Sequence, residues 1–212
     1  CLSPMNYVIP GDISSAAFWM VAGTIVPGSE IMLHDVGLNP TRSGIIEVLT
    51  RMGAQIRVEG LKMVGEEPVG NIVVRYSELN PVEIQGSIIP LLIDEIPILA
   101  IAMACANGSS VVRDAGDLRS KESDRIAMIV SSLNHMKVNA EEMNDGFIVS
   151  GNGLIMGTDT PLNPAGDHRI AMALAVAGLV SRVPMWIDGF ECADVSYPSF
   201  LDDLYKLVKQ SN

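Results

Sequence analysis

Three short segments place charged side chains beside apolar runs, where a charge is costly unless it has a partner or a function. In the first, Asp94 stands between the apolar stretches Leu91–Ile93 and Ile96–Ile98. Loss of hydration next to such a wall raises the pKa of a carboxyl group and suits it to act as a base. We therefore expect Asp94 to be a catalytic carboxylate, against the plainer reading of an aspartate that caps a helix.

The second segment is Leu118–Arg125, in which charges of opposite sign alternate. Lys121 and Arg125 are four residues apart, which places both on one face of a helix, and the free N–H groups of a helix start also attract anions. With Glu122 between them, the segment predicts an anion cradle with an acid in its middle. The alternative is a solvated helix start whose carboxylates complement the helix dipole.

The third segment, Gly166–Arg169, comes directly before the apolar run Ile170–Val180. Asp167 fits a helix cap. Arg169 at the mouth of an apolar helix requires an anionic partner, because a buried unpaired charge is costly, and either Asp167 or a bound ligand would supply it. His168 is weaker evidence, because a lone histidine is more often structural than catalytic.

The elements that position these residues repeat along the chain. Asp12, Asp94 and Asp167 each precede an apolar run that ends at a turn 16, 14 and 15 residues later (12 to 28, 94 to 108, 167 to 182). A second helix is expected 29, 28 and 30 residues after the same aspartates (12 to 41, 94 to 122, 167 to 197). Such spacings indicate three copies of one unit, about 8–80, 81–160 and 161–212, in a single domain 1–212. For Asp12 the favoured role is a helix cap that supports the first unit.

Each copy should hold an apolar helix, a short strand and an amphipathic helix, with further strands in the first two copies. The expected apolar helices are Ala16–Val26, Ile98–Ala106 and Ile170–Val180, and the strands that follow them are Glu30–His34, Ser110–Arg113 and Met185–Ile187. The expected amphipathic helices are Thr41–Met52, Glu122–Met136 and Tyr197–Lys209. The further strands are Gln55–Glu59, Asn71–Tyr76, Lys137–Ala140 and Gly146–Ser150. Helices that are apolar all round are buried on all sides. The predicted fold class is therefore α/β with three buried central helices, and the alternative is an ordinary three-layer α/β domain.

Parallel central helices would bring their starts to one face of the domain. The positive ends of their dipoles would then converge with the charged segments. The face predicted in this way holds Asp94, Lys121, Glu122, Arg125 and Arg169. Its expected ligand is a small polyanion, such as a phosphate or a compound that carries both phosphate and carboxylate.

Composition excludes several other classes of protein. The chain has 212 residues, of which 48% are hydrophobic and 18% charged, so it is not a disordered chain. Its formal net charge is −11, which argues against a nucleic-acid partner, because such a partner needs a basic surface. No stretch reaches the eighteen or so apolar residues of a membrane span, so no membrane partner is expected.

The cysteines indicate the cellular compartment, and the first residue bears on whether the chain is part of a longer protein. Cys1, Cys105 and Cys192 form no CxxC pair, and no histidine lies at a metal-ligand spacing from them. An odd, unpaired set is typical of a reducing compartment, so we expect a cytoplasmic protein without a metal site. Cys105 lies in an apolar run and is expected to be a core residue. Because the chain opens with Cys1 rather than Met, we expect a fragment of a longer protein.

Seven segments resemble one family. GDISSAAF, VGLNPTRSGIIEVL, MGA, IDEIPILAIA, RSKESDRI, GDHRIAMALAVAG and YPSF appear in the order in which they occur in 5-enolpyruvylshikimate-3-phosphate synthase (3-phosphoshikimate 1-carboxyvinyltransferase). The resemblance covers essentially the whole chain but only the C-terminal half of that enzyme. It implies one domain of the two-domain enolpyruvyl transferase fold, an inside-out α/β barrel of three units. It also implies that the N-terminal half of the same enzyme is a partner, and that this chain alone is inactive.

The resemblance implies a reaction of the shikimate pathway, which leads to chorismate and the aromatic amino acids. The family transfers the enolpyruvyl group of phosphoenolpyruvate to the 5-hydroxyl of shikimate 3-phosphate and releases phosphate, with no metal or organic cofactor. Glyphosate-like inhibitors bind at the phosphoenolpyruvate site of the family. Carried over to this chain, the resemblance makes Asp94 the base near the 5-hydroxyl and Glu122 the acid that protonates the methylene carbon. Lys121 would contact that hydroxyl or the departing phosphate, and Arg125 and Arg169 would be the cations that hold phosphoenolpyruvate. The supporting residues would be Asp12, Asp167 and His168.

Two positions depart from the family, and two other functions compete. Val195 stands where many members carry a lysine that reaches phosphoenolpyruvate, and Asp117 where some carry an asparagine that binds the shikimate phosphate. A carboxylate would repel that phosphate, so Asp117 is left out of the expected site. The alternatives are the sister enzyme UDP-N-acetylglucosamine enolpyruvyl transferase and a non-catalytic, repeat-built binding domain.

Overall fold

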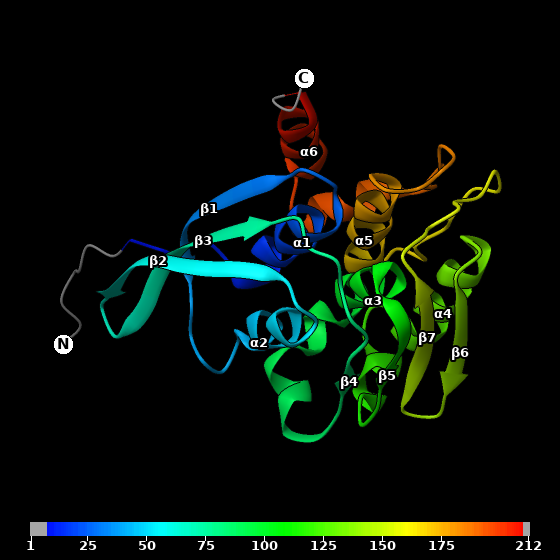
Figure 1. Ribbon diagram of the computed structural model, residues 1–212, viewed down its shortest axis with the longest axis horizontal. Helices are drawn as coiled ribbons and strands as arrows, with labels where there is room; N and C mark the ends of the chain where they lie inside the picture. Colours follow the sequence, from blue (N-terminus) through cyan, green and yellow to red (C-terminus); the bar gives the residue numbers. More distant parts are fainter. Residues whose placement is uncertain (1–7, 210–212) are drawn as a thin grey trace.

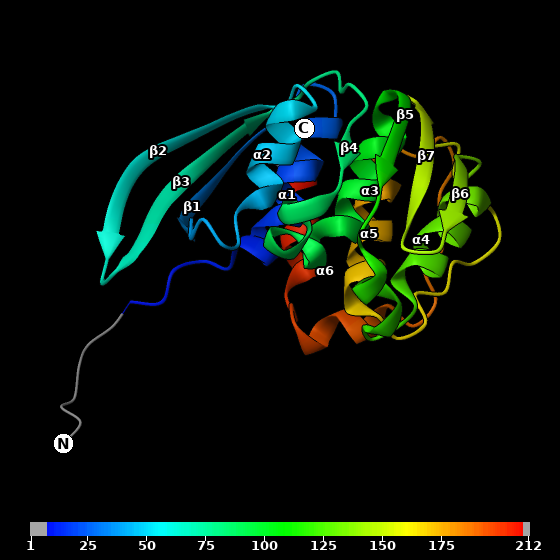
Figure 2. The same ribbon diagram turned by 90° about the horizontal axis from the view of Figure 1, so that it is seen from below.

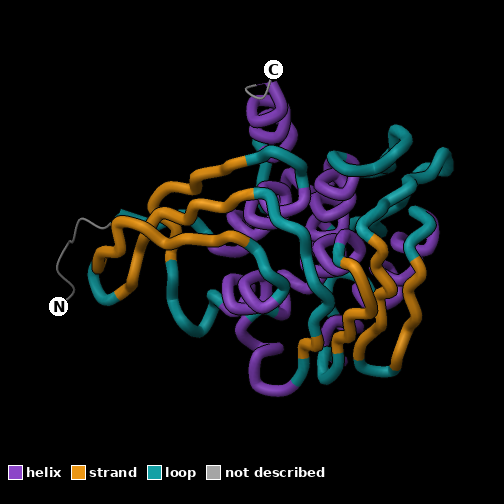
Figure 3. Tube along the Cα trace, in the orientation of Figure 1, coloured by secondary structure: helices purple, strands orange, loops and turns teal. Residues whose placement is uncertain are grey.

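The computed structural model describes residues 8–209 and is an α/β fold. Three helices lie in the middle of the molecule, with one sheet on either side of them, as Figures 1 and 3 show. Turning the molecule by 90° keeps this order of sheet, helices and sheet (Figure 2). The predicted α/β class with central helices is therefore confirmed.

The three central helices are α1 (Ile13–Ile25), α3 (Ile96–Cys105) and α5 (His168–Gly178), and they pack against one another. All are apolar on nearly every side, which is why they form the core rather than a surface. Gly23 also lets the chain beyond these helices approach α1 closely: a Cβ there would lie 3.3 Å from the side chain of Ile31. The predicted helix positions are confirmed within a few residues.

Two sheets, antiparallel except for one pair of strands, enclose the central helices. The first has the order β1-β3-β2, from β1 (Glu30–Gly37), β2 (Gln55–Val64) and β3 (Glu67–Arg75), and packs against α1. The second has the order β4-β5-β7-β6, from β4 (Glu83–Ile84), β5 (Asn107–Val112), β6 (Asn139–Met143) and β7 (Gly146–Asn152), with β4 parallel to β5. It packs against α3 and α4.

The outer helices are α2 (Gly44–Arg51), α4 (Arg125–His135) and α6 (Phe200–Lys209). Each begins three residues later than predicted, because polar or proline residues occupy the expected first turn. Before α4, the cap is Asp124, whose side chain accepts a hydrogen bond from the Ala127 N–H. The prediction that Lys121 and Arg125 share a helical face is therefore wrong, because Lys121 lies outside the helix.

Short 3-10 turns link these elements at η1 (Gly86–Leu91), η2 (Ile93–Glu95), η3 (Gly116–Ser120) and η4 (Phe190–Val195).

Two predicted strands differ from the structure. The strand expected at Lys137–Ala140 begins only at Asn139, because Lys137 has a positive φ of 66° that ends the preceding turn. Residues Met185–Ile187 form no strand; Ile187 makes a single bridge to Leu162, and the described chain provides no longer ladder there. The third segment therefore lacks the sheet of the other two, and the division into repeats stays a prediction.

The central helices run side by side in the same direction. At one end, Ser14 of α1 hydrogen-bonds Glu95 before α3, and Arg169 of α5 contacts Asp94. At the other end, Ile25, Cys105 and Leu179 line one cavity. The prediction that the helix starts meet on one face is confirmed.

The described residues also bear on the sequence expectations for membranes and cysteines. Between residues 8 and 209 there is no helix with the length and apolar character needed to cross a membrane. Cys105 and Cys192 are free, and burial raises the pKa of the Cys105 thiol to about 12, which agrees with a packing role. Cys1 lies outside the described residues.

Candidate active site

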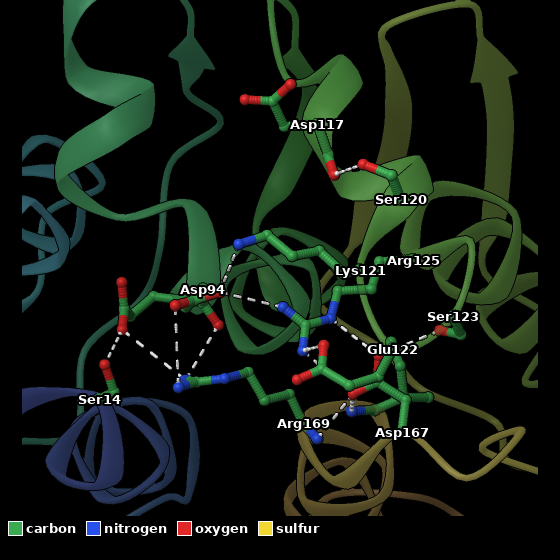
Figure 4. A network of polar contacts seen from close by, with 12 residues as sticks. Ser14, Asp94, Asp117, Ser120, Lys121, Glu122, Ser123, Arg125, Asp167 and Arg169 are labelled. Atoms are coloured by element: carbon green, nitrogen blue, oxygen red, sulfur yellow. Dashed lines mark hydrogen bonds and ion pairs between the residues drawn. The ribbon is translucent and has the colours of Figure 1, made fainter.

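Arg125 is the centre of the charged cluster. It is the first residue of α4, and its side chain is fully buried. Its Nε donates to Asp167 Oδ2 at 2.8 Å, its Nη1 to Asp94 Oδ1 at 3.1 Å and its Nη2 to Glu122 Oε2 at 2.6 Å (Figure 4). Burial alone would lower the pKa of this guanidinium, but the hydrogen bond and charge of Asp167 raise it. One arginine thus gathers carboxylates from three segments.

Asp167 holds both this arginine and a central helix. It is fully buried, caps α5 by accepting from the N–H groups of Arg169 and Ile170, and also accepts from the Ser123 hydroxyl at 3.0 Å. Burial raises the pKa of Asp167, but its bonds to Arg125 outweigh burial and lower it. The predicted cap is confirmed, and its main charge partner is Arg125 rather than the Arg169 that sequence reasoning had considered.

Asp94 lies where three cations meet. Lys121 Nζ is 3.3 Å and Arg125 Nη1 3.1 Å from its Oδ1, and Arg169 Nη2 is 3.9 Å from its Oδ2 (Figure 4). Burial raises the pKa of Asp94, but the charges of Arg169, Lys121 and Arg125 together lower it. The expectation of a raised pKa is therefore wrong, because sequence inspection found the apolar wall but not the cations. Asp94 is ionised at neutral pH and able to accept a proton.

Arg169 is the guanidinium with the looser set of contacts. Its side chain is 16% exposed, it donates to the backbone oxygen of Asp94 at 3.3 Å, and its nearest carboxylate atoms, in Asp94 and Glu95, are both 3.9 Å away. These distances are longer than those of a close charged hydrogen bond. Arg169 and Lys121 are thus more available than Arg125 to an incoming anion.

Glu122 and His168 border the open side of the cluster. The Glu122 side chain is 47% exposed and accepts a hydrogen bond from Arg125. His168 opens α5, and burial, followed by the charge of Arg169, lowers its pKa. A half-exposed carboxyl group next to a buried guanidinium can exchange protons with a bound ligand, which suits it to acid–base chemistry.

Sequence reasoning missed several polar residues of this face. Glu95 is 3% exposed and accepts from Ser14, which is 2% exposed. Arg42 donates to the Ser14 hydroxyl at 3.1 Å, and Ser123 donates to Asp167. The signal for Glu95 was its acidic side chain in the same apolar setting as its neighbour Asp94, whereas the pairing with Ser14 spans 81 residues and no local pattern reveals it.

The remaining candidates lie at the margin or elsewhere. Asp12 caps α1 by accepting from the Ser15 N–H at 2.9 Å, which confirms the favoured reading. Asp117 lies apart from the cluster (Figure 4), and Val195 is 85% exposed at the end of η4. Over residues 8–209, no three His, Cys, Asp or Glu side chains are grouped so that they could hold a metal ion.

The arrangement of helices matches a known class of fold. The chain superposes on the enolpyruvyl transferase NikO from Streptomyces tendae with a TM-score of 0.75 over 92% of this chain and 42% of that one. At 19% identity this likeness defines the fold only. The chain therefore has the fold seen in an enolpyruvyl transferase.

The sequence comparisons place the chain more narrowly. The family model described as EPSP synthase (3-phosphoshikimate 1-carboxyvinyltransferase) matches residues 2–204, so the chain belongs to this family. It is 48% identical over 208 residues to the 3-phosphoshikimate 1-carboxyvinyltransferase of Synechococcus sp. (strain RCC307), which covers 98% of this chain and 47% of the relative. The structure of EPSP synthase from Acinetobacter baumannii has a TM-score of 0.92 at 39% identity over 99% of this chain and 47% of that one. The chain thus spans about half the length of these relatives.

Proposed function

We propose that this chain contributes one wall of the active site of a 3-phosphoshikimate 1-carboxyvinyltransferase. The supporting observation is the meeting of Asp94, Lys121, Glu122, Arg125 and Arg169 at one face, within a chain that belongs to the family. The enzyme would join phosphoenolpyruvate to the 5-hydroxyl of shikimate 3-phosphate and release phosphate. We further propose that it works in the cytoplasm, which its unpaired cysteines support.

The geometry suggests a division of roles in an addition–elimination reaction. Asp94, ionised between its cations, accepts the proton of the attacking hydroxyl, and Glu122, at the open edge, protonates the methylene carbon so that C2 becomes electrophilic. The tetrahedral adduct then loses phosphate, which takes up the proton held by Asp94, and the methyl group returns its proton to Glu122. Lys121 and Arg169, the less tightly paired cations, are placed to balance the charge of the departing phosphate.

Arg125 has a more specific requirement. Three carboxylates already surround its buried guanidinium, so an anion reaches it only by taking the place of one of them. Glu122 is the partner to be displaced, since its side chain is 47% exposed while that of Asp167 is fully buried. We propose that the phosphoenolpyruvate carboxylate replaces Glu122 on Arg125, which frees Glu122 to take up a proton from solvent and deliver it to the methylene carbon.

The charge balance of this face explains why we expect the 212-residue chain to be inactive alone. Four carboxylates face four cations here, so the face has no net positive charge left for a ligand; the carboxylates are Asp94, Glu95, Glu122 and Asp167, and the cations Arg42, Lys121, Arg125 and Arg169. Two ligands that each carry phosphate and carboxylate need further cations and shielding from water. A second wall would supply both, and it would also be part of the pocket for glyphosate-like inhibitors.

Titration of the chain with phosphoenolpyruvate, shikimate 3-phosphate and UDP-N-acetylglucosamine tests this function. We expect weak binding of the first two, weakened further by salt because the face is open, and no specific binding of the third. Binding of UDP-N-acetylglucosamine in preference to shikimate 3-phosphate would point to the sister enzyme. Binding of none of the three would support a non-catalytic domain and contradict the proposal.

A further inference from the structure

Glu95 is a buried carboxyl group for which the proposed reaction has no role. Its side chain is 4% exposed, and it lies one residue before α3, next to Asp94. Burial raises the pKa of this carboxyl group, and the hydrogen bond from Ser14 and the charge of Arg169 offset that effect only in part. A buried carboxylate is costly unless such partners compensate it, so its contacts are the place to look for its function.

Ser14 is fixed as the donor to this carboxyl group. Arg42 Nη2 lies 3.1 Å from the Ser14 hydroxyl oxygen, and a guanidinium can only donate. The hydroxyl oxygen therefore accepts from Arg42, and its own hydrogen is directed to Glu95 Oε1. Because Ser14 lies in the first turn of α1 and is buried, it tethers Glu95 from a neighbouring helix.

The same oxygen of Glu95 is also the one paired with Arg169. Arg169 Nη1 is 3.9 Å from Glu95 Oε1, while its Nη2 is 3.9 Å from Asp94 Oδ2. Asp94 also forms closer ion pairs with Lys121 and Arg125, so it does not hold Arg169 tightly. The contacts thus run from α1 through Glu95 to α5, and they end at the guanidinium that is most available to an anion.

We propose that Glu95, tethered by Ser14, is a positioning residue that holds the Arg169 guanidinium in the orientation in which it meets an anionic ligand. This inference rests on the proposed function for the identity of that ligand, phosphoenolpyruvate. A long arginine side chain loses much rotational freedom when it binds, and a carboxylate that orients it beforehand reduces that cost. Glu95 does not touch the ligand; it acts through Arg169.

The test is a double-mutant cycle on the ¹⁵N-labelled chain, with phosphoenolpyruvate affinity measured by NMR titration. Glu95→Gln keeps the shape and the acceptor for Ser14 but removes the charge, and we expect its Kd to rise about tenfold, as for outer residues that orient a ligand-binding group. In an Arg169→Lys background the same change should have little further effect. Ser14→Ala should act in the same direction, more weakly. Glu30→Gln, which breaks the exposed Glu30–Arg75 pair, is the matched control and should change nothing.

Two results would overturn the inference. A tighter Kd for Glu95→Gln would mean that Glu95 only repels the ligand, and an equal loss in both backgrounds would mean that it acts without Arg169. The NMR chemical shift of the Arg169 Nε–H, compared between wild type and Glu95→Gln without ligand, separates this inference from the proposed function. If wild type binds no phosphoenolpyruvate, the function fails, while a Glu95-dependent Arg169 signal still supports the tether and an unchanged signal rejects it.

Discussion

The two arginines of the site, Arg125 and Arg169, show how burial separates similar residues into different tasks. Arg125 is fully buried and makes close bonds to Asp167, Asp94 and Glu122, whereas Arg169 is 16% exposed and lies 3.9 Å from its nearest carboxylates. The first gathers the loops of the site; the second has capacity left for a ligand. The contrast teaches that charge type alone does not identify a ligand-binding residue, because its existing partners decide how free it is.

The largest expected effect concerns Glu122, the exposed partner of Arg125. In an enzyme completed with the part of the Synechococcus relative that this chain does not cover, Glu122→Gln should lower kcat by about 10²–10⁴-fold, the usual cost of losing a proton donor. The Kd for phosphoenolpyruvate should not rise and is expected to fall, because an amide competes less than a carboxylate for Arg125. Steady-state assays would check this, and a variant with near-normal kcat would remove Glu122 from the chemistry.

The next effect tests the buried side of the comparison. Asp167→Ala leaves Arg125 without its buried partner, and breaking such a pair costs about 3–5 kcal/mol of unfolding free energy. Asp12→Ala removes a cap from α1 without breaking a buried pair, so it should cost about 1 kcal/mol. Urea unfolding of both variants measures the difference. Equal losses would show that Asp167 acts as a cap and no more.

A smaller effect is expected at Arg169, in ligand affinity rather than stability. Arg169→Met removes a charged contact to the ligand, typically worth about 1.5–3 kcal/mol, so phosphoenolpyruvate should bind roughly tenfold or more weakly. The melting temperature should barely change, because the native contacts of Arg169 are long. If Arg169→Met lowered the melting temperature strongly and left the Kd unchanged, the roles assigned to the two arginines would be reversed.

The smallest effect is a pH dependence of stability. The pKa values of Asp94 and Asp167 are lowered by their cations, so each stabilises the fold fully above its unfolded pKa near 4, and this stabilisation is lost as pH falls through the lower folded value. Melting temperatures measured from pH 6 to pH 2 should therefore fall below about pH 4. Asp167→Asn should flatten this fall, and an equally steep fall in that variant would exclude Asp167 as its source.

The sequence was sufficient for what local patterns encode. The three apolar runs predicted the central helices, because no other element buries residues on every side for about ten positions. The spacing of the leading aspartates predicted that the helix starts would share a face, as the contacts of Ser14 and Arg169 confirm. The outer helices were predicted to begin three residues too early, because the sequence does not show which of several polar residues is the helix cap.

Pairings across the chain explain the rest. The pKa of Asp94 was predicted in the wrong direction because three cations reach it from segments 27 to 75 residues away in sequence. Arg125 could be singled out by its charge, but its complete burial could not, because its buried partner Asp167 lies 42 residues further along the chain. Glu95 and Ser14 each lie in a segment that resembles the family, but no local pattern pairs them; their contact exists because α1 and α3 lie side by side.

The most direct test of the proposed function is phosphate release from phosphoenolpyruvate in the presence of shikimate 3-phosphate, measured with and without the complementary half from the Synechococcus relative. We expect no steady release by the 212-residue chain alone, release when the complementary half is added, and little release when the added chain carries Glu122→Gln. Steady release by the chain alone, or none by a complex shown to assemble, would contradict the assignment of one wall of the active site to this chain.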